Sequence, residues 1–309
     1  MKKKTVMLLS GIALAAALIF CAYRIDMSRM EHNRPVVFST WGYDYAPPVI
    51  EEDALPKYSN LADEAVCKEF DSVMESAGIS KMRRDIFFEY VNQFNESVSE
   101  KSLVDEFRTL DTSAPLYDPY EMQDEWNENN PDFLGYNCRI TSYSLFGDYI
   151  DIPLGRESDN NMILFDLSAL EEDSSAFPDG NDTQRFATLY STVPTAVTKD
   201  INVHTDTMAQ YRNRQGISFK ENQYASLITV VFHEAWEDES YLFIGHTGVL
   251  FQTEKGLYFV EKIAFQEPYQ LTVFNNRAEL NEYLMGKYDV AEDWSGAAPF
   301  VMENNTLMK

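Results

Sequence analysis

The order of the patterned segments predicts an α+β fold in which a helical N-terminal half packs on an antiparallel β-sheet. From Asn60 to about Phe107, apolar residues recur at helical spacing, with one break at Gly78-Ile79-Ser80. From Ile217 onward, β-branched and aromatic residues gather in short runs that turn residues separate. Helices that precede a run of strands are typical of α+β domains and not of alternating α/β folds.

Residues 1–23 have the pattern of an export signal or a membrane anchor. Lys2, Lys3 and Lys4 precede an apolar run from Val6 to Tyr23. Within this run, Leu18-Ile19-Phe20-Cys21 resembles a bacterial lipobox, in which the cysteine is lipid-modified after cleavage. Two alternatives stay open: a lipoprotein anchored at Cys21, or an uncleaved helix whose lysines remain in the cytoplasm. Both predict an extracytoplasmic protein anchored to the membrane.

Residues 24–56 are expected to be a tether and an extended lead-in, and residues 57–304 a single domain. Prolines disfavour helix in the tether: Pro35, Pro47, Pro48 and Pro56. Residues 111–134 are rich in Asp, Glu, Asn and Pro, with aromatic residues between them, and we expect a loop that forms one wall of a cleft.

Cys138 is expected at the first turn of a helix that runs to about Phe146. Gly135 and Asn137 are typical of a helix start, and neither Pro nor Gly follows until Gly147. A helix N-terminus favours the thiolate form of cysteine.

The remaining segments complete the expected order of elements. The acidic, turn-prone stretch Leu167–Gln184 predicts a surface excursion. A helix is expected at about Ala278–Tyr288. The sequence predicts four meander strands and one closing strand, at Tyr224–Phe232, Tyr241–Phe251, Leu257–Phe265, Gln270–Phe274 and Pro299–Met302.

Charge and composition exclude several kinds of partner and cofactor. The 309 residues carry a formal net charge of -25, which disfavours nucleic acid and anionic lipid as partners. No phosphate-cradling glycine motif is present, and we expect no cofactor. No metal is expected either: Glu237 replaces the second histidine in His233-Glu234-Ala235-Trp236-Glu237, and Pro178–Asp182 lacks the spacing of an EF-hand loop.

Cysteine usage agrees with export but not with a disulfide framework. With Cys21 in the anchor, Cys67 and Cys138 are left. Cys67 lies among apolar residues at helical spacing, which favours a buried structural thiol, although a bridge to Cys138 stays open.

The chain resembles the NlpC-type members of the papain-like cysteine hydrolases. In that family a His-x-Gly-hydrophobic pattern lies on one strand and a third polar residue lies on the next; His246-Thr247-Gly248-Val249 and Phe259-Val260-Glu261 are similar. Residues 57–304 also resemble a family of bacterial surface lipoproteins with a domain of unknown function. Three segments carry that likeness: Asn137-Cys138-Arg139, Gly245-His246-Thr247-Gly248 and Phe265-Gln266-Glu267-Pro268-Tyr269.

The first resemblance implies a papain-like fold and a catalytic role for Cys138, His246 and Glu261. The Cys138 thiolate would attack a carbonyl, His246 would protonate the leaving amine, and Glu261 would orient the imidazole. The loop length of the hairpin decides whether Glu261 and His246 share a face. Gln266 is a reserve orienter or oxyanion donor, and the Cys138 N–H, Asn137 and Tyr136 are further oxyanion candidates.

We therefore expect a membrane-anchored cysteine hydrolase that cleaves amide bonds, with peptide or peptidoglycan as substrate. The competing hypothesis is a non-catalytic surface module that keeps the same fold and uses its cleft for binding. A third is a structural or assembly factor at the envelope, which requires no cleft.

Overall fold

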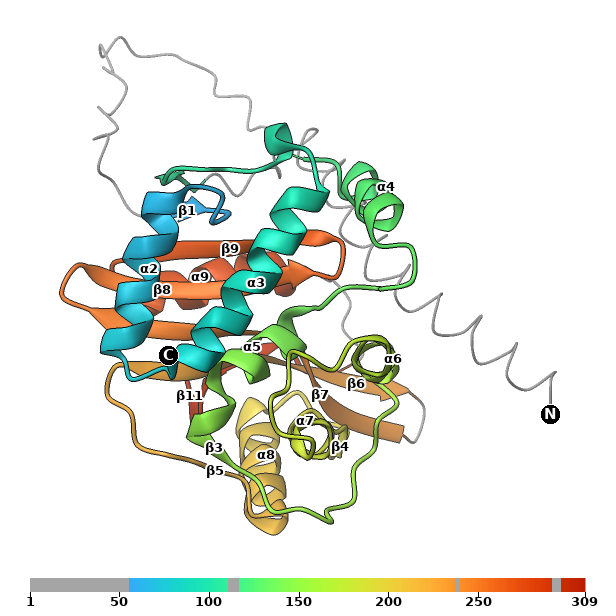
Figure 1. Cartoon of the computed structure of the whole chain (residues 1–309). Helices are drawn as coiled ribbons and strands as arrows, with labels where there is room; N and C mark the ends of the chain where they lie inside the picture. Colours follow the sequence, from blue (N-terminus) through green and yellow to red (C-terminus); the bar gives the residue numbers. More distant parts are fainter. Residues whose placement is uncertain (1–55, 111–116, 237–238, 291–295, 309) are drawn as a thin grey trace, which may run out of the picture.

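The computed structural model describes residues 56–110, 117–236, 239–290 and 296–308, where eight α-helices accompany a nine-stranded sheet (Figure 1). The predicted anchor with Cys21 and nearly all of the predicted tether lie outside these residues. Among the described helices, none has the length and apolar character needed to cross a bilayer.

The sheet has the strand order β11-β10-β6-β7-β8-β9-β1-β2, with β4 beside β7, and every pairing is antiparallel. The α+β class and the antiparallel sheet are thus confirmed. The strands span Lys57–Ser59 (β1), Arg108–Thr109 (β2), Val193–Pro194 (β4), Ala225–Trp236 (β6), Glu239–Thr253 (β7), Gly256–Ala264 (β8), Glu267–Phe274 (β9), Phe300–Glu303 (β10) and Thr306–Leu307 (β11). β3 (Ile150–Asp151) and β5 (Ser218–Phe219) form a separate small sheet.

The helices cover both faces of the large sheet. They span Glu64–Ser76 (α2), Lys81–Ser97 (α3), Pro119–Asn129 (α4), Cys138–Phe146 (α5), Leu164–Glu172 (α6), Asp182–Leu189 (α7), Ile201–Gln215 (α8) and Arg277–Tyr288 (α9). α2, α3 and α5 lie on one face and α9 on the other (Figure 1). Neighbouring residues of β6 follow this division, since Leu227 packs in the larger core and Ile228 in the core under α9.

The predicted loop at 111–134 is wrong for residues 119–129, where α4 forms, while the described residues on either side of α4 are non-helical. The carboxylate of Asp118 accepts a hydrogen bond from the Tyr120 N–H at 2.8 Å, and Pro119 occupies the first turn. Trp126 is buried and stacks on Phe94 at 5.6 Å between ring centroids. This segment therefore contributes to the core and not to a cleft wall.

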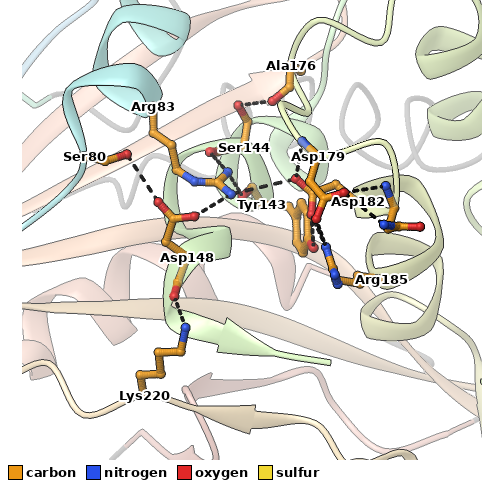
Figure 2. A network of polar contacts seen from close by, with 11 residues as sticks. Ser80, Arg83, Tyr143, Ser144, Asp148, Ala176, Asp179, Asp182, Arg185 and Lys220 are labelled. Carbon is orange, nitrogen blue, oxygen red and sulfur yellow. Dashed lines mark hydrogen bonds and ion pairs between the residues drawn. The ribbon is translucent and has the colours of Figure 1, made fainter. Parts of the chain in front are cut away.

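The predicted surface excursion at 167–184 holds only for the exposed turn at 178–181 and is wrong for the rest of the segment. α6 and the start of α7 occupy it, and Leu170 and Phe177 are buried in the main core. The acidic residues that suggest solvation include Asp182, which is only 3% exposed and accepts hydrogen bonds from Tyr143 and Arg185 (Figure 2). Buried partners replace water around these carboxylates.

Side chains fix both ends of α5: Arg83 of α3 at the C-terminal end and the cap residue Asn137 at the N-terminal end. At the C-terminal end, the buried Arg83 donates from Nη1 to the Ser144 carbonyl at 2.5 Å, and its Nη2 lies 2.8 Å from Asp148 (Figure 2). A cation favours a helix C-terminus because of the helix dipole. The N-terminal end begins at Cys138.

Candidate active site

Cys138 is the first residue of α5, as the sequence predicts. Asn137 is the N-cap, and its Oδ1 accepts from the backbone N–H groups of Arg139 at 3.0 Å and Ile140 at 3.1 Å. The Asn137 side chain does not accept a hydrogen bond from the backbone N–H of Cys138 itself. Gly135 before it has φ +88°, and a Cβ there would lie 3.1 Å from the Trp126 ring. The local sequence therefore fixes the thiol at a capped helix N-terminus.

A buried ion pair ties this helix start to α6. Arg139 donates from Nε and Nη2 to the two oxygens of Asp166, both at 2.7 Å. Asn137 Nδ2 donates to the same carboxylate at 2.8 Å, and Asp166 is fully buried. A bidentate pair of this kind fixes orientation as well as distance.

The start of α5 lies where two strands of the sheet separate. β7 and β8 pair only from Val249–Val260 toward their connecting turn, while farther along β7 it is β4 that pairs, at Leu242–Val193. Between these points Arg139 Nη1 donates to the Ile244 carbonyl at 3.1 Å. A residue of α5 thus satisfies a backbone acceptor that a neighbouring strand would otherwise use.

His246 lies in this gap, directly after a β-bulge. Val230 pairs with His246 while the next residue, Val231, pairs with Ile244, so Gly245 is the extra residue of β7. A Cβ at Gly245 would lie 2.5 Å from the Phe232 ring, and only glycine fits without displacing that ring. The bulge shifts the alternation of side chains along β7 by one residue, so that His246 points to the α9 face of the sheet. There the Tyr288 ring stacks on the imidazole with 4.8 Å between the ring centroids.

Glu261 reaches His246 across the same face. Thr253 pairs with Gly256, so the hairpin loop has two residues, and this register places Glu261 and His246 on one side. Their Nε2 and Oε2 atoms are 2.5 Å apart, and both side chains are buried. Nδ1 is therefore the ring nitrogen that Glu261 leaves for the thiol, and Cys138 and His246 lie close enough for the charge of each to shift the pKa of the other.

Helix α9 and β9 supply further partners of Glu261. Tyr283 donates its hydroxyl to Oε1 at 2.6 Å, and Gln270 Nε2 donates to the Tyr283 oxygen at 3.1 Å. Lys287 Nζ lies 4.0 Å from Oε2. The sequence predicts this helix but gives no sign that its polar face covers the histidine. The four-residue spacing of Tyr283 and Lys287, one helical turn, is the signal that could have drawn attention to them.

The charges in this cluster favour a thiolate–imidazolium pair. Burial opposes ionisation of Cys138, but His246 and Arg139 outweigh it and hold the pKa of the thiol below its ordinary value. Burial likewise lowers the pKa of His246, but Cys138 and Glu261 raise it to about 9. Despite burial, Lys287, His246 and Tyr283 lower the pKa of Glu261 to about 2. Near neutral pH His246 is therefore protonated and Glu261 ionised, and both the imidazolium and Arg139 favour the thiolate form of Cys138.

The other predicted site residues lie elsewhere or have other partners. Gln266 lies in the turn between Ala264 and Glu267, and among the described residues no hydrogen bond joins it to Cys138 or His246. Tyr136 donates its hydroxyl to the Asp173 carbonyl at 2.7 Å. The polar atoms of Asn137 serve the cap and Asp166, so both side chains already have partners within the folded chain.

The remaining cysteine and the histidine of the zinc-like motif have structural contacts. Cys67 and Cys138 are both free thiols, and Cys67 is half-buried with its thiol donating to the Leu61 carbonyl at 3.2 Å. His233 Nδ1 accepts from the Ala297 N–H at 2.8 Å, and its Nε2 lies 2.6 Å from Ser240 Oγ. In the described ranges no three His, Cys, Asp or Glu side chains gather as metal ligands.

A family model described as a domain of unknown function (DUF4300) matches residues 57–308, and the chain belongs to this family. The predicted membership of a family of unknown function is thereby confirmed. No curated protein and no solved structure matches the chain. Because the family description names no activity, the function has to be inferred from the chemistry of the site.

Proposed function

We propose that this member of the DUF4300 family is a cysteine hydrolase that acts on amide bonds. The observation that supports it is the contact series Cys138–His246–Glu261, in which a thiol at a helix N-terminus meets a histidine oriented by a carboxylate. A nucleophile, a base and an orienting group in this order are the common elements of acyl-transfer sites. The papain-like fold is part of the same proposal, and the helix-then-sheet order with the thiol opening a helix supports it.

The geometry suggests a role for each group. The Cys138 sulfur would attack the carbonyl carbon of the amide, and imidazolium His246 would give its proton to the departing amine, leaving a thioester. Neutral His246 would then take a proton from water, whose oxygen attacks the thioester and releases the acid. Glu261 keeps Nε2 as the donor nitrogen, so that Nδ1 faces the sulfur throughout.

The sequence supports a location and a class of substrate for this proposal. The export pattern of residues 1–23 supports an extracytoplasmic domain that Cys21 or a transmembrane helix holds at the membrane. The net charge of -25 favours neutral or cationic peptides, including cell-wall peptide, over anionic polymers.

One observation favours the second candidate, a binding module without catalysis. Cys138 is only 5% exposed, whereas a hydrolase needs its sulfur to reach the substrate. In a binding module the buried triad would stabilise the fold, and the thiol would not react.

Acylation of the full chain distinguishes the two candidates. The probe is p-nitrophenyl acetate, and the variants are Cys138→Ser, His246→Ala and, as the matched thiol control, Cys67→Ser. We expect a release of p-nitrophenolate equal to one acyl group per chain, retained in Cys67→Ser and lost in the other two. Equal release by Cys67→Ser and Cys138→Ser would contradict the hydrolase proposal. Peptide amides and peptidoglycan fragments then define the substrate.

A further inference from the structure

Tyr190 has a buried hydroxyl that meets no hydrogen-bond partner in the described part of the chain. It follows the last residue of α7, its side chain is only 1% exposed, and its ring packs on Phe186 at 4.8 Å. The hydroxyl is buried without a partner at hydrogen-bond geometry. Buried tyrosine hydroxyls normally find one, and an unpaired group costs free energy.

Other buried tyrosines nearby do have acceptors. Tyr143 donates to Asp182 at 3.2 Å, Tyr136 to the Asp173 carbonyl at 2.7 Å, and Tyr211 to the Thr188 carbonyl at 2.7 Å. The unpaired hydroxyl of Tyr190 is therefore not a general feature of how these tyrosines pack.

The register of β4 places Tyr190 at the gap that holds His246, because Tyr190 lies three residues before Val193, which pairs with Leu242 of β7. Apart from burial, Cys138 is the group that most strongly raises the pKa of Tyr190, and Arg139 and Asp166 also act on it. Thr247, the neighbour of His246, lies close enough to lower the pKa of Tyr190, but no bond of hydrogen-bond geometry joins the two hydroxyls, and Thr247 donates its proton to the Ile228 carbonyl at 2.7 Å. An unpaired donor thus faces the start of α5.

We propose that the Tyr190 hydroxyl is an oxyanion donor: it hydrogen-bonds the carbonyl oxygen of the acyl group that Cys138 attacks. The inference rests on the proposed hydrolase function and adds a catalytic residue to it. The described part of the chain offers this hydroxyl no acceptor, and the carbonyl oxygen of the substrate supplies one. The Cys138 N–H, which the Asn137 cap leaves out, supplies the second donor.

The chemical step balances without transfer of the tyrosine proton. The thiolate sulfur forms a bond to the carbonyl carbon while the π electrons of the C=O bond move to oxygen. Tyr190 donates a hydrogen bond to that oxygen as its charge grows. The C=O bond then re-forms, the bond to the leaving group breaks, and the leaving group departs with its electron pair.

Two probes separate this role from the proposed function. Acylation by p-nitrophenyl acetate passes through an oxyanion, whereas alkylation by iodoacetamide is a displacement at a saturated carbon and does not. In Tyr190→Phe, carrying Cys67→Ser, we expect acylation of Cys138 to fall about 100-fold. Alkylation of Cys138 should stay within about twofold, because the ion pair with His246 is untouched.

Tyr211→Phe is the matched control, since it removes a hydroxyl that has an acceptor. It should leave acylation unchanged and lower the thermal midpoint, whereas Tyr190→Phe should keep or raise that midpoint. Equal rates of acylation in Tyr190→Phe and its parent would overturn the oxyanion role alone. A parent that reacts with neither probe at Cys138 would overturn the hydrolase proposal and this inference with it.

Discussion

Two cysteines stand in the first turns of two helices, and their surroundings drive their pKa values in opposite directions. Cys67 follows the acidic cap Asp63 and Glu64 at the start of α2, and burial together with these two carboxylates raises its pKa to about 11. Cys138 follows the neutral cap Asn137 and contacts His246, and its pKa lies below the ordinary value. Cys138 is also the more buried of the two.

This difference indicates that neither the helix N-terminus nor burial alone determines the pKa of a cysteine. Both cysteines lie near the positive end of a helix dipole, yet only Cys138 has beside it an imidazole that can take up the thiol proton. The charges in contact with each sulfur decide the outcome. The chain therefore contains its own reference thiol for every experiment on Cys138.

His246→Ala should have the largest effect on this comparison. At about pH 6, a thiol with a free pKa of about 8.5 reacts up to about 300-fold more slowly than one that is fully ionised. We expect alkylation of Cys138 by iodoacetamide to fall toward that limit while Cys67 keeps its rate, with both followed by peptide mass spectrometry. A Cys138 rate that survives the substitution would mean that His246 does not ionise the thiol.

Asp166→Ala should come next, because it leaves Arg139 buried without its carboxylate. We expect the free energy of unfolding to fall by about 3 kcal/mol, measured by denaturant titration. At the other helix start, Asp63→Ala removes a cap from a more exposed position and should cost only about 1 kcal/mol. Similar losses in the two variants would show that the Arg139–Asp166 pair does not hold α5 in place.

Lys287→Met should change the pH dependence of Cys138 and not its rate at neutral pH. Lys287 helps to hold the pKa of Glu261 at about 2, so its removal raises that pKa. Because Glu261 then takes up a proton as the pH falls, His246 loses its partner at a higher pH than in the parent. We expect Cys138 alkylation to decrease about threefold near pH 4 and to be unchanged at pH 7. A loss of rate at pH 7 instead would indicate a structural role for Lys287.

Asp63→Asn should have the smallest effect and should act on the reference thiol. The amide oxygen can still accept from the Val66 N–H, which lies 2.9 Å from the present carboxylate, while the charge is removed. The pKa of Cys67 should fall below about 11. Its alkylation at about pH 8 should rise about threefold, and Cys138 should be unaffected. An unchanged Cys67 rate would leave burial and Glu64 as the causes of its high pKa.

The sequence predicts the separate parts of the site better than their assembly. Asn137 and Gly135 indicate the start of α5 because capping is local chemistry, and the β-branched runs indicate β6 to β9. The gap between β7 and β8 depends on where β4 and Arg139 pair, which no local pattern encodes. Gly245 could be read as a loop signal as easily as a bulge.

Acidic residues misled the sequence interpretation for a physical reason. Asp166 and Asp182 occur in or next to a polar, turn-rich stretch, which normally indicates a solvated surface. In the structure Asp166 is buried against Asn137 and Arg139, and Asp182 against Tyr143 and Arg83, all from distant segments. Composition gives no sign of such long-range partners, and the same is true of Tyr190.

The most direct test of the central claim, a Cys138–His246 ion pair, is the ultraviolet absorbance of the thiolate as a function of pH. Absorbance needs no reagent to reach the buried sulfur, so burial cannot hide the result. In the full chain carrying Cys67→Ser, with Cys138→Ser as the added control, we expect a Cys138 thiolate to be present already at about pH 6. It should disappear at that pH in His246→Ala. A thiolate that forms only near the free value of about 8.5 or above would contradict the ion pair.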